Sequence, residues 1–87
     1  MKTPEQLDLA SRIVRLARTP DAIFLLGRTL ALADMVRTFE EARHGAQGAF
    51  LTALSLLDAV DARSRLGDLT RVLDMLEAQT LRRETSP

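Results

Sequence analysis

The segment from Pro20 to Phe39 constrains the fold most, because it reads as one long helix with apolar residues on two sides. At about 100° per residue, one side carries Phe24, Leu25, Ala31, Leu32, Met35, Val36 and Phe39. The nearly opposite side carries Ile23, Leu26, Leu30 and Ala33. A surface helix of a monomer needs a single apolar stripe, so this helix is predicted to be buried on both sides. Its second cover comes either from the same bundle or from another chain.

This helix is predicted to begin at Pro20 and to run to about Arg43. Thr19 is placed to cap its first turn, and proline suits the first helical position. Gly27 lies inside the helix, where glycine is less stable than alanine by about 1 kcal/mol. Its presence there favours a close approach of another helix as the reason for keeping it.

A shorter amphipathic helix is predicted before it, from Pro4 to Arg18. Thr3 and Gln6 have the spacing of a capping box. The apolar face of this helix carries Leu7, Leu9, Ala10, Ile13, Val14, Leu16 and Ala17. Pro20 then forces a tight turn, because the residue before a proline is pushed out of the α region. The first two helices are therefore predicted to form an antiparallel hairpin.

A third helix is predicted from about Ala49 to Arg63, after a loop that starts at His44. Gly45 is expected to end the preceding helix in the left-handed conformation. The apolar face of the third helix carries Ala49, Phe50, Ala53, Leu54, Leu56, Leu57 and Val60. Its opposite face is polar, which is typical of a helix covered on one side.

The last helix is predicted to follow a break or kink at residues 64–68 and to run to about Arg83. It is marked by leucines at coiled-coil spacing, Leu66, Leu69, Leu73 and Leu76. Residues 84–87 are expected to fray, as chain ends do.

These elements predict an all-α protein, a single domain over residues 1–87 built as an antiparallel bundle of about four helices in two hairpins. A core of this size supplies little net stability, so small domains often dimerise. The formal net charge is +0, which removes charge repulsion between copies. We therefore expect a homodimer, formed through the second helix.

Several sequence features predict a cytoplasmic protein that does not cross a membrane. Glu5 and Asp8 interrupt any apolar export signal near the first residues. The longest uncharged run, Ala46 to Leu57, is much shorter than the roughly 20 residues that span a bilayer. The chain has no cysteine, which is compatible with a reducing compartment. Its richness in arginine, alanine and leucine is typical of a GC-rich bacterium or its phage.

The sequence offers little to catalysis or to metal binding. It has no cysteine, no tyrosine, a single histidine and no glycine-rich phosphate loop. Glu41 and His44 have the Glu-x-x-His spacing of di-metal helical bundles. One such pair beside a glycine loop does not complete a site, so no metal, no cofactor and no enzymatic activity is predicted.

Two basic features of the sequence bear on binding to anionic partners. Residues 62–73 loosely suggest a helix-turn-helix, but Asp68 would face phosphate, and the neutral net charge lacks the electrostatic term that dominates DNA affinity. Arg12, Arg15 and Arg18 form an outward stripe on the first helix. This stripe is either a solvated face or a contact for an acidic partner.

The surplus apolar surface favours protein recognition, which needs no special residue types. The predicted interface is the arc formed by Phe24, Leu25, Leu32, Met35, Val36 and Phe39. The resulting hypothesis is a small, non-catalytic interaction protein that binds another protein and regulates or escorts it. The alternative is a structural subunit of a larger complex, and a weak DNA-binding regulator comes third.

Overall fold

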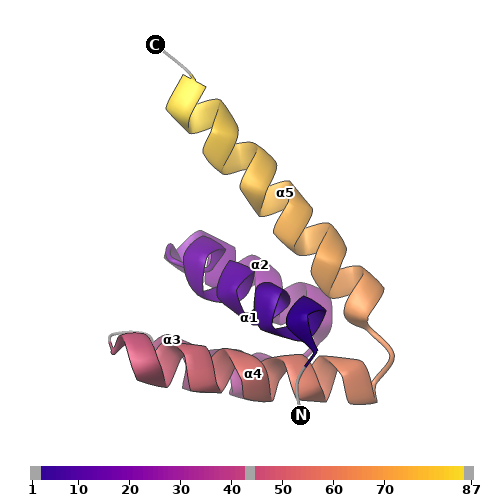
Figure 1. Cartoon of the computed structure of the whole chain (residues 1–87). Coiled ribbons are helices and arrows are strands. Elements are labelled where there is room, and N and C mark those ends of the chain that lie inside the picture. The colour runs from indigo at the N-terminus through magenta and orange to yellow at the C-terminus, as the bar shows by residue number, and fades with distance from the viewer. Residues whose placement is uncertain (1–2, 43–44, 86–87) are drawn as a thin grey trace.

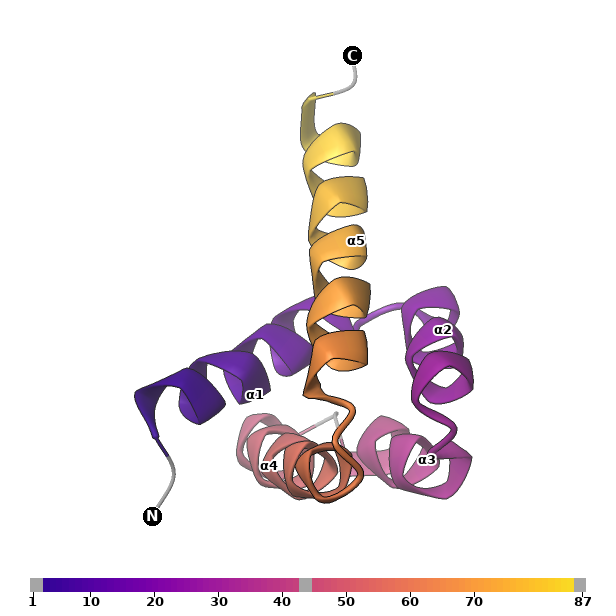
Figure 2. The same ribbon diagram turned by 90° about the vertical axis from the view of Figure 1, so that its right-hand side faces the viewer.

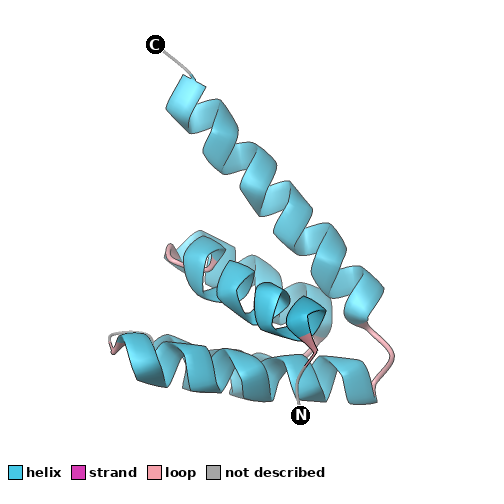
Figure 3. Cartoon of the chain, viewed as in Figure 1, coloured by secondary structure: helices cyan, strands magenta, loops and turns pink. Residues whose placement is uncertain are grey.

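Five α-helices and no strand make up the described part of the chain, residues 3–42 and 45–85 of the computed structural model (Figure 3). The helices are α1 (Pro4–Leu16), α2 (Pro20–Leu30), α3 (Ala33–Ala42), α4 (Ala46–Ala62) and α5 (Leu66–Thr85). The predicted all-α class is therefore confirmed. The predicted number of helices is wrong, because the long second helix is two helices.

The long helix breaks at Ala31. Helix α2 ends at Leu30, Ala31 takes the left-handed conformation with φ 56° and ψ 36°, and α3 begins at Ala33. Left-handed backbone costs a residue with a Cβ about 1–2 kcal/mol. Burying one large apolar side chain returns about 1.5–3 kcal/mol, and the break buries several. The correction to the predicted continuous helix therefore follows from burial, which outweighs local backbone preference.

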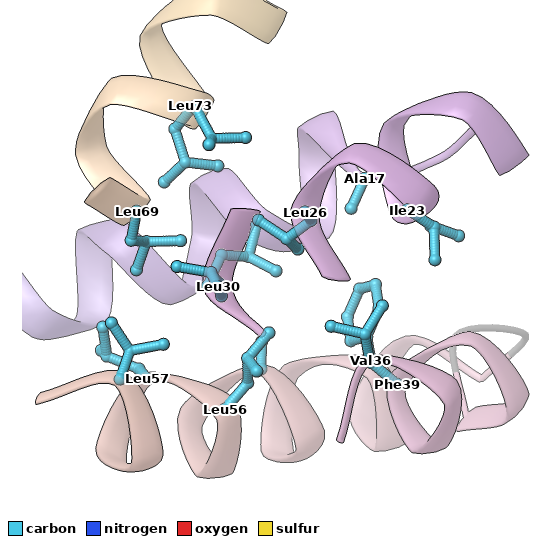
Figure 4. Packing of buried hydrophobic residues seen from close by; sticks show 14 of the residues in the cluster. Ala17, Ile23, Leu26, Leu30, Val36, Phe39, Leu56, Leu57, Leu69 and Leu73 are labelled. Carbon is cyan, nitrogen blue, oxygen red and sulfur yellow. The ribbon is translucent and has the colours of Figure 1, made fainter. Parts of the chain in front are cut away.

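The reversal at Ala31 brings both predicted stripes to the same core. Leu26 and Leu30 reach it from α2, while Val36 and Phe39 reach it from α3 (Figure 4). In a straight helix these two sets would point in nearly opposite directions. Folding α3 back along α2 removes the need for a second chain to cover them.

The predicted starts of the first two helices are confirmed. The Gln6 amide donates to the Thr3 hydroxyl at 3.2 Å, and the Thr3 amide donates to the Gln6 side-chain carbonyl at 3.0 Å. The Ala22 amide donates to the Thr19 hydroxyl at 3.1 Å. These short-range caps satisfy amides that have no partner inside the helix, so they form wherever the chain offers the spacing.

The two later boundaries differ from the predictions in detail. Gly45 has φ −109° and caps the start of α4, so it does not take the left-handed conformation expected of a helix end. Helix α4 therefore starts at Ala46, before the predicted Ala49. The predicted break after α4 is real, and its left-handed residue is Ser64, with φ 56°. Helix α5 continues through Thr85, and residues 86–87 lie outside the described part of the chain.

The helices are arranged around α5 and α4 (Figures 1 and 2). Helix α1 packs chiefly on α4, α3 also packs on α4, and α2 packs on α5 and α3. Helix α5 contacts both α1 and α2, which lie on opposite sides of it in Figure 2. The predicted hairpin of the first two helices is thus replaced by separate packing partners, whereas α2 and α3 do form a hairpin. The C-terminal end of α5 projects from the other helices in Figure 1.

The core is entirely apolar. No polar or charged side chain is buried among the described residues. The largest fully buried side chains are Phe39, Ile13, Leu26, Leu30, Leu56, Leu57, Leu69, Leu73, Val60 and Val72, and they come from all five helices. The Cα radius of gyration is 12.4 Å, close to the roughly 12 Å expected for a compact chain of this length. Within the described ranges, every helix is too short or too polar to span a membrane.

Replacing Ala31 with glycine tests the break directly. The left-handed conformation suits glycine, so Ala31→Gly is expected to raise the free energy of unfolding by about 0.5–1 kcal/mol. In a continuous helix the same change would lower it by about 1 kcal/mol. Urea unfolding monitored by circular dichroism gives the sign. Ala59→Gly, in the interior of α4, is the control and is expected to destabilise; destabilisation by both would contradict the break.

Candidate functional site

A groove between α2 and α3 is the most distinctive surface feature of the described residues. Its volume is about 460 Å³, within the usual range of about 300–1,000 Å³ for ligand pockets. Its lining is Pro20, Ile23, Phe24, Gly27, Arg28, Ala33, Val36, Arg37 and Glu40. Apolar side chains form most of this lining, and three charged side chains, two basic and one acidic, complete it. The groove is therefore suited to a ligand or partner surface that is apolar at its centre and charged at its periphery.

Gly27 keeps the floor of the groove hollow. It is buried, and a Cβ at this position would lie 3.4 Å from Cγ1 of Val36 on α3. A methyl group would thus meet α3 at ordinary contact distance, and a longer side chain would fill the groove. Gly27 therefore does pack against another helix, and that helix is the second half of the same predicted helix; the contact distance is an ordinary one.

Phe24 lies at this groove with 69% of its surface exposed. It is the most exposed of the large apolar side chains in the described ranges. Exposed aromatic side chains beside a concave apolar surface are typical anchors of protein interfaces. Ile23, Leu26 and Leu30 of α2 are buried and Leu25 is half-buried, so the exposure of Phe24 is a local property.

The charged side chains of the groove are Arg28 on α2 and Arg37 and Glu40 on α3, and all three are exposed. Neither arginine forms an ion pair with another described residue. By contrast, arginines elsewhere form ion pairs with acidic side chains of the same chain: Arg12, Arg15, Arg65 and Arg71. The groove thus carries two cations that the fold itself does not use.

The six residues of the predicted interface arc do not share one surface. Leu32, Val36 and Phe39 are only 5%, 4% and 1% exposed, because the break at Ala31 turns them into the core. Leu25 is half-buried against the core, and among the five arc residues whose side chains are described only Phe24 is well exposed. The side chain of Met35 lies outside the described part of the structure.

The predicted basic stripe on α1 is partly used inside the chain. The Arg12 guanidinium donates to the carboxylates of Asp74 at 2.9 Å and Glu77 at 3.0 Å, both on α5. The hydrogen bond to Asp74 is the main reason that the pKa of Arg12 is raised above its ordinary value, while burial opposes the shift. Arg15 lies 3.9 Å from Glu77, and Arg18 is exposed. Arg12 therefore links α1 to α5 and is not available to a partner.

A second long-range arginine contact was not foreseen from the sequence. The Arg65 guanidinium donates to the backbone carbonyl of Leu30 at 2.8 Å, where α2 ends. Such a carbonyl has no partner inside its own helix, and the cation also suits the negative end of the helix dipole. This contact supports the break at Ala31. The sequence holds one usable signal of that break, because the acidic residue Asp34 lies in the first turn of α3.

The other predicted sites find no assembled geometry. His44 of the Glu41/His44 pair lies outside the described residues, and within those residues no three metal-ligating side chains gather. In the helix-turn-helix-like segment, Arg65 and Arg71 lie 3.7 Å and 4.0 Å from Asp68. Their charge is therefore partly neutralised by a neighbour on the same segment.

Comparisons with known proteins add no family to this description. The chain matches no family model, and no curated protein and no solved structure is detectably similar to it. Function is therefore inferred from the groove and its charges.

Replacing Arg12 tests the link between α1 and α5. Only 16% of the Arg12 side chain is exposed, and it binds two carboxylates that are themselves more exposed. Arg12→Ala is expected to lower the free energy of unfolding by about 1 kcal/mol, less at high salt. Arg15→Ala is the control with a smaller expected effect, because its side chain is largely exposed and its contact is longer. Equal losses for both variants in urea unfolding would contradict this assignment.

Proposed function

We propose that this protein is a non-catalytic interaction module that binds a helix of another protein in the groove between α2 and α3, and so regulates or escorts that protein. The observation that carries the proposal is the exposure of Phe24 beside a hollow apolar floor. An amphipathic helix laid in an apolar groove is a common mode of recognition, in which a few large side chains act as anchors.

The completeness of the core supports a regulator over a structural subunit of a larger complex. Leu26, Leu56 and Leu73 are fully buried within the single chain. An obligate subunit typically leaves such residues for its partner to cover, and its stability then depends on that partner. We therefore expect the isolated chain to fold alone, with the groove as its functional surface.

The homodimer expected from the sequence is the competing proposal, in which a second copy of the chain occupies the same groove. The arc on which it depended is largely buried, so a second copy would contact Phe24 and the groove walls. We expect light scattering on a sizing column to give the monomer mass of 9.6 kDa across a dilution series. A dimer mass at every dilution that Phe24→Ser converts to monomer would show instead that a second copy fills the groove.

Selection from a library of helical peptides tests the function. Peptides selected on the wild-type chain are expected to lose binding to Phe24→Ser, because the anchor contact is removed. The matched control is Leu51→Ser on α4, another exposed large apolar residue, 58% exposed. Both variants should keep their stability within about 0.5 kcal/mol, since both side chains lie on the surface.

The readout is the dissociation constant of the recovered peptides, measured by fluorescence anisotropy. Peptides that bind both variants equally well, or that depend on Leu51 only, would show that the groove is not the recognition surface.

A further inference from the structure

Given the proposed function, we infer that the partner helix is amphipathic and acidic: apolar side chains fill the groove, and its flanking carboxylates pair with Arg28 and Arg37. The inference names the chemical class of the partner and the two residues that select it. It follows from the charge, shape and direction of the groove walls.

The charge of the groove is local. The whole chain has a formal net charge of +0, yet the groove lining holds two arginines and one glutamate. Arg28 and Arg37 make no ion pair within the described ranges, whereas Arg12, Arg65 and Arg71 do. Two unpaired guanidinium groups beside an apolar surface match carboxylates, which they can bind in a bidentate geometry.

The shape of the groove favours a helix over a flat surface. Its two walls are helices joined by residues 31–32, and its floor is hollow at Gly27. A volume of about 460 Å³ accommodates a few large side chains that project from one face of a helix. An anionic membrane would also attract arginines, but a bilayer surface does not enter a concavity of this kind.

The direction of the two walls orders the charges along the groove. Helices α2 and α3 are joined by residues 31–32 alone, and Gly27 of α2 packs on Val36 of α3, so the two helices run in opposite directions along each other. Pro20 and Glu40 therefore lie toward one end, and Arg28 and Ala33 lie toward the connection, with Arg37 between the ends. The partner is accordingly expected to place its carboxylates toward the connection, and any basic residue toward Glu40.

A second copy of this chain meets these requirements less well. The projecting end of α5 carries the exposed Arg83 in its last turn. A cation there would repel Arg28 and Arg37. Two copies that met groove to groove would bring four arginines and only two glutamates from these linings together.

The test uses the peptides recovered by selection on the full chain. Each peptide is remade with its aspartates and glutamates replaced by asparagine and glutamine, and both forms are titrated against the wild-type protein. The acidic form is expected to bind roughly three- to tenfold tighter, the effect of about two surface ion pairs. The difference should disappear near 1 M salt, where the screening length is about 3 Å.

Variants of the protein locate the charge effect. In the double variant Arg28→Gln, Arg37→Gln, the two peptide forms are expected to bind equally, and in Arg28→Glu, Arg37→Glu a lysine-substituted form should bind best. The matched control is Arg71→Gln, because the Arg71 side chain is 81% exposed on α5 and is not part of the groove lining. This control is expected to preserve the preference for the acidic form.

The outcomes separate the two proposals. Equal binding of both peptide forms to the wild-type chain, with loss on Phe24→Ser, would overturn the acidic partner and leave the groove as the interaction surface. Recovery of no groove-dependent peptide would overturn both. Binding of phosphatidylglycerol vesicles that depends on Phe24 and Arg28, without any peptide binding, would overturn both in favour of a membrane contact.

Discussion

The chain reversal at Ala31 is the constraint on which the rest of the structure depends. It places two apolar stripes, which a straight helix would hold on opposite sides, around a single core. Its cost is a left-handed residue that is not glycine, about 1–2 kcal/mol, and the burial of Leu32, Val36 and Phe39 exceeds that cost. The reversal thereby places Val36 and Phe39 in the same core as Leu26 and Leu30.

Polar contacts at the edges of the core fix the arrangement that apolar packing favours. Because the buried residues are all apolar, packing alone does not distinguish strongly between similar placements of α5. Arg12 connects α1 to two carboxylates of α5, and Arg65 connects the start of α5 to the end of α2. Both contacts join segments far apart in the chain, and both lie where solvent can still reach part of the group. They therefore fix the orientation of α5 relative to α1 and α2 more than they add to the free energy of unfolding.

The groove is a by-product of the same reversal. Folding α3 along α2 sets Gly27 against Val36, and the missing side chain leaves a hollow beside Phe24. The fold neutralises Arg12 and Arg65 through its own carboxylates but leaves Arg28 and Arg37 beside this hollow. A surface with an exposed aromatic side chain and unpaired cations has properties that the stability of the chain does not require, which is why we interpret it as a binding site.

Local sequence by itself determined the helical class, the caps at Thr3 and Thr19 and the end of the fourth helix near Ser64, since each depends on neighbours within a few residues. The periodicity of residues 20–42 also showed correctly that two faces had to be buried. Whether a second chain or a chain reversal would bury these faces depended on contacts among all five helices. Ala31 itself carries no local signal that the chain reverses there. Only the tertiary structure could therefore decide that Phe39 lies in the core, that Phe24 lies at the surface and that Arg12 binds α5, because each outcome depends on residues distant in the chain.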